Sequence, residues 1–330
     1  MRLSFGRRTL AVAGGATAAL VIASVAFATS TVNNPKYNLA KLKGTITADG
    51  SSTVGPYTQA GAELFARAGA KNVRITVGIS GTGGGFQRFC KGETDLSDAS
   101  RPMRQSEAKS CKDNNVGSWR GFHIANDALT VVVNRDNTWA TCLSVAELKK
   151  IWEPGSKVNN WKDVRSSFPD QSLKLFGPGT DSGTFEYFTE AINGRARSSR
   201  SDYQASEDDN VLVQGVAGER GGLGYFGYSY FVENQNRLRA VQIRNPKTDQ
   251  CVAPGVASVF NHTYKPLSRP LFIYAKGSSF KRTEVQAFLD FVFDNEKAIA
   301  TRARFIPLTK QQLKRARAIF HQAVVAARNP

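Results

Sequence analysis

A polar, glycine-rich loop that leads directly into an amphipathic helix is the feature that most constrains this chain. The loop covers residues 177–184, and apolar residues recur at helical spacing through residues 185–192. Its polar residues are of types that favour helix N-caps: Asp181, Ser182 and Thr184. Such a loop presents unpaired backbone N–H groups and the positive end of the helix dipole, which attract anions. Because many loops of this kind only cap a helix, one alone does not establish a site.

Two further stretches repeat this design. β-type runs at residues 44–48 and 73–77 each enter a polar loop, at residues 49–56 and 80–85, and a helical stretch follows. In open α/β sheets such loops gather at the carboxyl ends of the strands, where ligands bind. The three loops offer hydroxyl groups that suit a small tetrahedral oxyanion: Ser52, Thr53, Ser80, Thr82, Ser182 and Thr184. The Gly-Lys-Ser/Thr signature of a nucleotide-binding P-loop is absent from the sequence.

Alternating strands and helices predict an α/β fold with three-layer α/β/α lobes and a mostly parallel sheet. The two most apolar runs, residues 129–133 and 271–275, lie far apart in the chain. We expect them to be crossover strands between two lobes. The prediction is therefore a split lobe I, residues 44–133 and 263–330, with lobe II inserted as residues 134–262.

The N-terminus has the pattern of a signal peptide over residues 1–28. A basic head precedes an apolar run over residues 10–26, and small residues at Ala26 and Ala28 form a cleavage signature. The alternative is an uncleaved membrane anchor, because the run nearly reaches spanning length. Residues 29–43 are expected to form a polar leader. The protein is therefore expected to be exported to the periplasm, the extracellular space or the cell envelope.

The chain is strongly basic, with a net charge of +17. Three of these charges belong to residues 1–28, which contain no acidic residue, so residues 29–330 carry +14. This excess of positive charge could attract nucleic acid, an anionic cell envelope or an anionic ligand. No zinc-finger, helix-turn-helix or RNA-binding signature accompanies it, so a nucleic-acid partner is not expected.

Four cysteines follow the signal peptide: Cys90, Cys111, Cys142 and Cys251. An even number in an exported chain favours disulfides, and four cysteines allow three pairings. The sequence contains only three histidines and no Cys-x-x-Cys motif. Neither a metal site nor a cofactor is therefore expected.

Five motifs taken together resemble the phosphate-binding proteins of bacterial phosphate ABC transporters. They occur in that family's order and span nearly all of the chain after the leader: residues 49–54, 80–85, 98–103, 180–184 and 222–225. The resemblance implies a periplasmic-binding-protein (Venus-flytrap) fold, in which a two-segment hinge joins two α/β lobes. It further implies that dehydrated inorganic phosphate binds between the lobes of a monomer and passes to a membrane ABC permease.

The resemblance also implies a set of ligand-binding residues. The first loop would contribute Ser52, Thr53 and the Val54 amide, and the second Ser80 or Thr82. The loop of the other lobe would contribute its capping segment: Ser182, Gly183 and Thr184.

The sequence departs from the family pattern at two places. Pro178 stands where the family often has an arginine, which makes Arg101 the candidate cation, with a surface ion pair as its alternative role. Many relatives have an aspartate that accepts the hydrogen-phosphate proton in the turn that here contains Ser100. Asp98 and Asp181 are the candidates to replace it, and Asp181 could instead be a simple N-cap.

The expected lobes suggest a disulfide pairing. Cys90 and Cys111 both fall in lobe I, whereas Cys142 and Cys251 both fall in lobe II. We therefore expect Cys90–Cys111 and Cys142–Cys251.

The sequence leaves three rival functions open. The same fold could bind another oxyanion, such as sulfate, molybdate or a phosphorylated molecule. A secreted hydrolase is disfavoured, because Gly-x-Ser-x-Gly is absent and the Ser-x-x-Lys pattern of residues 106–109 lacks companion motifs. An adhesin that uses the positive charge is the third. We expect a binding protein and not an enzyme.

Overall fold

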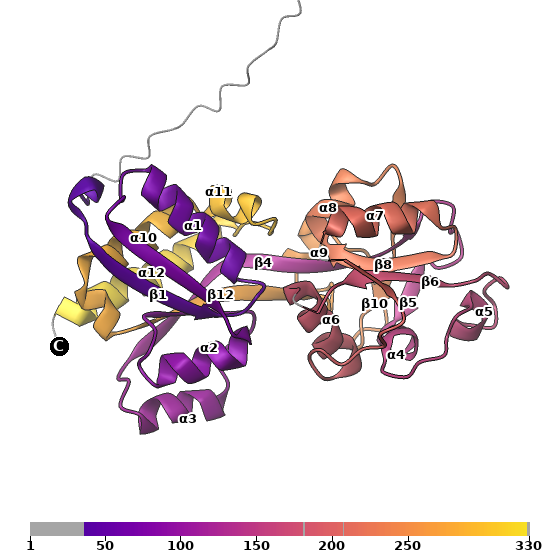
Figure 1. The fold of residues 1–330 in the computed structure, drawn as a ribbon, viewed down its shortest axis with the longest axis horizontal. Helices are drawn as coiled ribbons and strands as arrows, with labels where there is room; N and C mark the ends of the chain where they lie inside the picture. The colour runs from indigo at the N-terminus through magenta and orange to yellow at the C-terminus, as the bar shows by residue number, and fades with distance from the viewer. Residues whose placement is uncertain (1–35, 181, 207, 329–330) are drawn as a thin grey trace, which may run out of the picture. The chain divides into compact units, whose positions relative to one another are not determined.

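The computed structural model describes residues 36–180, 182–206 and 208–328 (Figure 1). The predicted signal peptide and Asp181 lie outside the described residues. Within them, no helix is both long and apolar enough to cross a bilayer.

The predicted polar leader is partly wrong, because residues 36–43 belong to the fold. Leu39, in a short 3-10 helix (η1, Leu39–Lys41), is 8% exposed and packs in a hydrophobic core. Tyr37 and Leu42 pack against the same core. These few apolar residues among polar neighbours show no periodicity that would have indicated burial.

One curled sheet runs through both lobes, in the order β2-β1-β3-β12-β4-β8-β6-β7, and β9 pairs with β4. Its strands have these bounds: β1 Gly44–Gly50, β2 Val73–Ile79, β3 Leu96–Ala99, β4 Trp119–Asn134, β6 Lys174–Pro178, β7 Gln204–Ser206, β8 Gly222–Gly227, β9 Leu238–Ala240 and β12 Ser268–Lys276. β1 is parallel to β2 and β3, and β6 is parallel to β7 and β8. β12 is antiparallel to β3 and β4, and β4 is antiparallel to β8. The sheet is thus mixed and not mostly parallel, because the strands that cross between lobes run against their neighbours.

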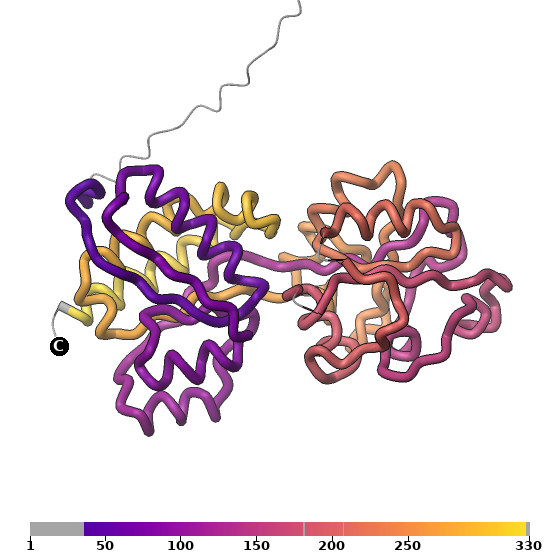
Figure 2. Tube along the Cα trace, viewed as in Figure 1, coloured from indigo at the N-terminus to yellow at the C-terminus, as the bar shows by residue number. Residues whose placement is uncertain are grey.

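Lobe I has the predicted three layers. One face of its sheet is covered by α1 (Gly55–Arg67), α10 (Thr283–Asp294), α11 (Glu296–Arg302) and α12 (Lys310–Arg328), which share a core rich in phenylalanine. The other face is covered by α2 (Gly81–Cys90) and α3 (Gln105–Asp113), and η2 (Ser278–Lys281) follows β12. Figure 2 shows the indigo N-terminal part and the yellow C-terminal part of the chain side by side in this lobe.

Lobe II repeats the arrangement. α4 (Val145–Trp152), α5 (Trp161–Val164) and α6 (Gly183–Asn193) pack on one face of the sheet, and α7 (Asp209–Gly218) and α8 (Tyr228–Glu233) pack on the other. A small sheet in the order β11-β10-β5 and the helix α9 complete the lobe: β5 Cys142–Ser144, β10 Gln242–Arg244, β11 Cys251–Val252 and α9 Val256–Phe260.

The hinge consists of β4 and the segment that enters β12, as the two-segment prediction required. Along β4, Ala125 belongs to the core of lobe I, whereas Leu129 belongs to the core of lobe II. On the return, Leu267 packs in lobe II and Leu271 packs in lobe I. We therefore propose lobe boundaries within these intervals instead of after residues 133 and 262. The side chains of the apolar run 129–133 pack in the second lobe, which the sequence alone could not indicate.

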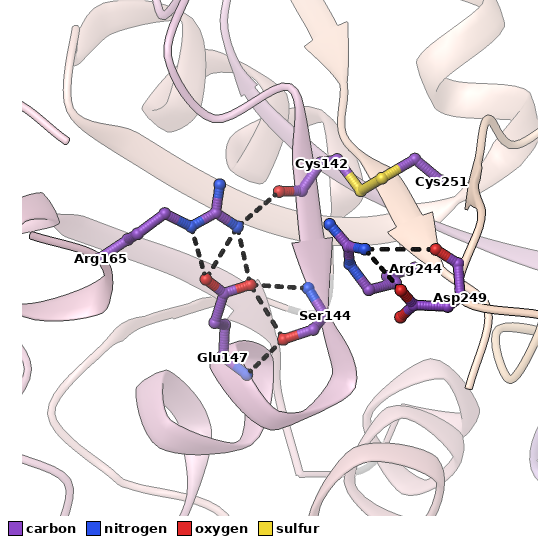
Figure 3. The surroundings of a disulfide bond; sticks show 7 residues. All are labelled: Cys142, Ser144, Glu147, Arg165, Arg244, Asp249 and Cys251. Carbon is purple, nitrogen blue, oxygen red and sulfur yellow. Dashed lines mark hydrogen bonds and ion pairs between the residues drawn. A yellow bond between two sulfur atoms is a disulfide. The ribbon is translucent and has the colours of Figure 1, made fainter. Parts of the chain in front are cut away.

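Both predicted disulfides are confirmed. Cys90–Cys111 joins the ends of α2 and α3 within a small buried cluster of lobe I. Cys142–Cys251 joins β5 to β11 in lobe II (Figure 3). Beside the second bridge, Arg165 donates hydrogen bonds to the Glu147 carboxylate and to the Cys142 carbonyl.

Candidate oxyanion-binding site

The first loop connects β1 to α1 and is folded tightly on itself. Gly50 has a φ of +148°, and a Cβ there would lie 2.1 Å from the Asp98 carbonyl oxygen, so only glycine fits. The Val54 amide donates to the Ser51 carbonyl at 3.1 Å. It is therefore engaged within the loop and does not point to a ligand in this structure. No side chain caps α1, but its first-turn donors are occupied: the Gly55 amide donates to the Ser51 carbonyl, the Tyr57 amide donates to the Val54 carbonyl, and Pro56 has no N–H. The loop therefore offers an anion its hydroxyl groups and the positive end of the helix dipole.

The second loop connects β2 to α2 and is held by a carboxylate that the sequence analysis did not single out. The Ser80 amide and hydroxyl both donate to Asp49 Oδ1, at 3.1 and 2.8 Å. Arg88 pairs with the other oxygen of Asp49. No side chain caps α2, whose first turn is rich in glycine. Ser80 is thus fixed beside a helix N-terminus that can receive an anion.

The third loop joins β3 to α3 and contacts the second. Thr82 Oγ1 lies 3.1 Å from Ser100 Oγ and accepts a hydrogen bond from the Ser100 amide at 3.2 Å. Arg101 forms a two-point ion pair with Glu107, at 2.7 and 2.9 Å, which matches the alternative role weighed from the sequence. Burial opposes the ionised form of Glu107, but the hydrogen bonds and positive charges of Arg101 and Arg104 together outweigh it and lower the pKa of Glu107. Arg101 Nη2 nevertheless lies 4.0 Å from the position of a Cβ on Gly83, at the start of α2.

The fourth loop connects β6 to α6 and has the predicted capping geometry. Ser182 Oγ accepts hydrogen bonds from the Thr184 and Phe185 amides, at 3.1 and 3.4 Å. A Cβ on Gly183 would lie 2.4 Å from Thr53 Oγ1. The loop of lobe II therefore meets the first loop of lobe I at Thr53.

Other residues of α6 extend this contact between the lobes. Ser52 Oγ donates to Glu186 at 3.4 Å, and Arg104 pairs with Glu190 at 3.4 Å. The structure thus brings hydroxyls and helix N-termini of the two lobes close to one another. Among the described residues, no group of three or more histidine, cysteine, aspartate or glutamate side chains could hold a metal ion.

Comparisons with known proteins agree with this geometry. The chain is 46% identical to Protein SphX of Synechococcus elongatus, over 80% of this chain and 77% of the relative. It is 37% identical to the Phosphate-binding protein PstS of Staphylococcus epidermidis, over 83% and 82% of the two chains. The model of a PBP superfamily domain matches residues 35–296.

The chain belongs to the phosphate-binding proteins of the PBP superfamily. Its fold is similar to the crystal structure of a possible phosphate binding protein from Planctomyces limnophilus, with a TM-score of 0.82 and 46% identity over 86% of this chain and 99% of the other. The family expected from the five motifs is therefore confirmed, together with the two-lobed fold.

Asp98 is buried and does not lie where a residue that contacts the ligand directly would lie. Its side chain is fully buried, and Oδ1 accepts a hydrogen bond from Thr58 of α1 at 2.8 Å. Oδ2 has no hydrogen-bond partner among the described residues. Burial raises the pKa of Asp98 to about 7, and the nearby Asp49 adds to this while the Thr58 bond opposes it. The carboxyl lies beneath the first loop and not on its surface.

A cation that the sequence analysis missed lies next to the first loop. Arg269, on β12, donates from Nη2 to Thr53 Oγ1 at 2.8 Å. It also donates from Nε to Asp127 at 3.2 Å, and its guanidinium carbon lies 3.6 Å from the centre of the Tyr187 ring. The sequence separates Arg269 from Thr53 by 216 positions. A faint signal existed, because a charged residue stands near the start of each apolar crossover run.

Proposed function

We propose that this protein is an exported substrate-binding protein that captures inorganic phosphate between its two lobes and delivers it to a membrane ABC permease. The names of its relatives support phosphate as the ligand. The contact between Thr53 and Gly183 carries the proposal, because it brings anion-attracting helix N-termini from the two lobes to one place.

The proposed ligand site keeps the set expected from the family: Ser52, Thr53, Val54, Ser80, Thr82, Asp98, Ser100, Arg101, Asp181, Ser182, Gly183 and Thr184. Ser52 and Thr53 are best placed to donate from lobe I, since their hydroxyls lie where α6 meets that lobe. The Val54 amide would first have to leave the Ser51 carbonyl. Asp98 would act from beneath the loop, and Asp181 is proposed on the family pattern alone.

We also propose binding without catalysis. Ser182 Oγ serves as a helix cap, and among the described residues no histidine or carboxylate forms a hydrogen bond with it. A serine nucleophile needs such a base. We infer a monomer that acts outside the cytoplasm, where its two disulfides persist.

Calorimetric titration of the mature, phosphate-stripped chain tests the proposal. A micromolar site requires about 8 kcal/mol. A few hydrogen bonds of about 1.5–3 kcal/mol each to a charged ligand can supply this after ordering costs. We expect micromolar or tighter phosphate binding and no response to sulfate. Equal binding of both would indicate a general oxyanion site, and binding of neither would reject the proposal.

A further inference from the structure

Three contacts hold the guanidinium group of Arg269 at the meeting point of the lobes. The strand register pairs Arg269 with Asp127 on β4, so one contact comes from the hinge itself. Thr53 provides the second from the first loop of lobe I, and the Tyr187 ring provides the third from α6 of lobe II. The Arg269 side chain is 11% exposed. A long side chain that is already ordered in this way loses little further entropy when it binds a ligand.

These contacts leave hydrogen-bonding capacity at the guanidinium group. An arginine side chain has five N–H donors. Nε bonds to Asp127 and one N–H of Nη2 bonds to Thr53, while Nη1 has no partner among residues 36–180, 182–206 and 208–328. Because Thr53 Oγ1 accepts from Arg269, the proton of the Thr53 hydroxyl remains free to donate to an anion. Arg269 thereby orients a residue of the proposed site and keeps donors of its own.

Two other arginines near the loops, Arg88 and Arg101, are more fully neutralised. Arg101 is held at two points by Glu107, and Arg88 pairs with both Asp49 and Glu93. Arg269 faces a single carboxylate, which it contacts through Nε alone. Pro178 occupies the position from which lobe II would otherwise supply a cation. The positive charge for a dianion in this site is thus best supplied from the hinge.

We propose that Arg269 is the cation that contacts the bound oxyanion, and that its contact with the Tyr187 ring couples ligand binding to the docking of α6 on lobe I. This inference rests on the proposed function. It places the ligand-binding cation on the crossover strand β12, whereas the sequence suggested Arg101 in the turn after β3. Two-point hydrogen bonding from a planar guanidinium to a tetrahedral oxyanion is geometry that lysine cannot reproduce.

The test measures phosphate affinity by calorimetry for the wild type and for Arg269→Gln, Arg269→Lys and Arg282→Gln. Arg282 is the control, because it is likewise a partly buried arginine that forms ion pairs, here with Asp95 and Glu284 of lobe I, but lies outside the site. Arg269→Gln should weaken phosphate binding about tenfold or more, as expected for the loss of a charge-assisted hydrogen bond. The phosphate affinity of Arg269→Lys should lie between those of the wild type and Arg269→Gln. Arg282→Gln should bind phosphate as tightly as the wild type does.

The pH dependence of the affinity distinguishes a ligand-binding role of Arg269 from a purely structural one, for which the loss in Arg269→Gln should not depend on the charge of the ligand. If Arg269 supplies charge, Arg269→Gln should lose more affinity above the second pKa of phosphoric acid, where the ligand is a dianion, than below it. If the wild type binds phosphate tightly and Arg269→Gln binds it equally well, the inference about Arg269 is overturned and the proposed function still stands. Absence of phosphate binding by the wild type would reject the proposed function, and the inference with it.

A second measurement covers the case in which Arg269→Gln does not fold. In wild-type protein labelled with ¹⁵N-arginine, the guanidinium resonance of Arg269, assigned by its absence from Arg269→Lys, should shift when inorganic phosphate is added. A resonance that stays unchanged at saturating phosphate would contradict the inference.

Discussion

Thr53 of lobe I and Gly183 of lobe II approach so closely that a Cβ at residue 183 would lie 2.4 Å from the Thr53 hydroxyl oxygen and 2.5 Å from its backbone nitrogen. A backbone atom cannot move aside as the end of a flexible side chain can. Any larger residue at position 183 must therefore push the two loops apart. The contact makes the smallest residue of the capping segment a determinant of how the lobes meet.

Gly183→Ala should weaken phosphate binding about tenfold or more. The added methyl group pushes the loop of lobe II away from Thr53, and ligand-binding groups that are misplaced by about 1 Å bind much less well. Calorimetric titration measures the effect. The matched control is Gly218→Ala at the end of α7, where a Cβ meets nothing within 4 Å. Wild-type affinity in Gly183→Ala would contradict the proposed meeting of the loops.

Ser182→Ala should lower both stability and phosphate affinity. The hydroxyl caps α6, and the loss of an N-cap costs about 1 kcal/mol. Ser144→Ala removes a comparable cap from α4, away from the site, so urea denaturation should show a similar loss with unchanged phosphate binding. Equal affinity in the two variants would remove Ser182 from the proposed site.

The two disulfides should have separable effects. Cys142–Cys251 spans 109 residues and Cys90–Cys111 spans 21, so loop closure predicts about 1.5 kcal/mol more destabilisation when the longer bridge is removed by paired Cys→Ala substitutions. Cys90–Cys111 joins the two helices that begin at the second and third loops. Only removal of Cys90–Cys111 should weaken phosphate binding measured by calorimetry. Weaker binding after removal of Cys142–Cys251 alone, or a larger loss of stability in urea after removal of Cys90–Cys111, would refute this account.

The free energy of unfolding should fall as the pH rises from about 4 to about 7. Burial raises the pKa of both Asp98 and Glu296 to about 7, from 3.8 and 4.5 respectively. In this window the folded protein keeps protons that the unfolded chain has released, so a rise in pH favours unfolding, and above about pH 7 the effect levels off. A difference of one pKa unit corresponds to about 1.4 kcal/mol.

Asp98→Asn should flatten that dependence, since it removes one of the two groups and retains a side chain that can bond to Thr58. Urea denaturation at a series of pH values measures the slope. An unchanged slope in Asp98→Asn would mean that Asp98 titrates in the folded protein as it does in the unfolded chain.

The loops and their helices could be predicted because their signal is local. Glycine and hydroxyl residues at the start of a helix indicate a cap wherever the helix later packs, and Ser182 has the expected capping bonds. The disulfides followed from the lobe assignment, which depends on two long apolar runs. Charge patterns were less reliable. Arg200 lies in a charged stretch typical of a surface loop, yet its side chain is 2% exposed and bonds to the carbonyls of Ile151 and Val158.

The contacts that complete the candidate site could not be predicted, because they depend on tertiary structure. Arg269 reaches Thr53 only after the chain has formed lobe II and returned through β12. Arg101 has the same residue type and a better sequence context, but capping-box geometry places Glu107 against it. Asp98 lies near the end of the short strand β3, where ligand residues of such sheets occur, but its carboxyl is buried against α1 and bonded to Thr58.

A crystal structure of the mature chain grown with phosphate and without sulfate tests the central claim most directly. The account predicts a tetrahedral anion within hydrogen-bonding distance of Thr53 and of the segment that contains Gly183, with a guanidinium N–H of Arg269 donating to it. An anion bound at another place, or both loops empty at a phosphate concentration that saturates the protein in solution, would contradict the account.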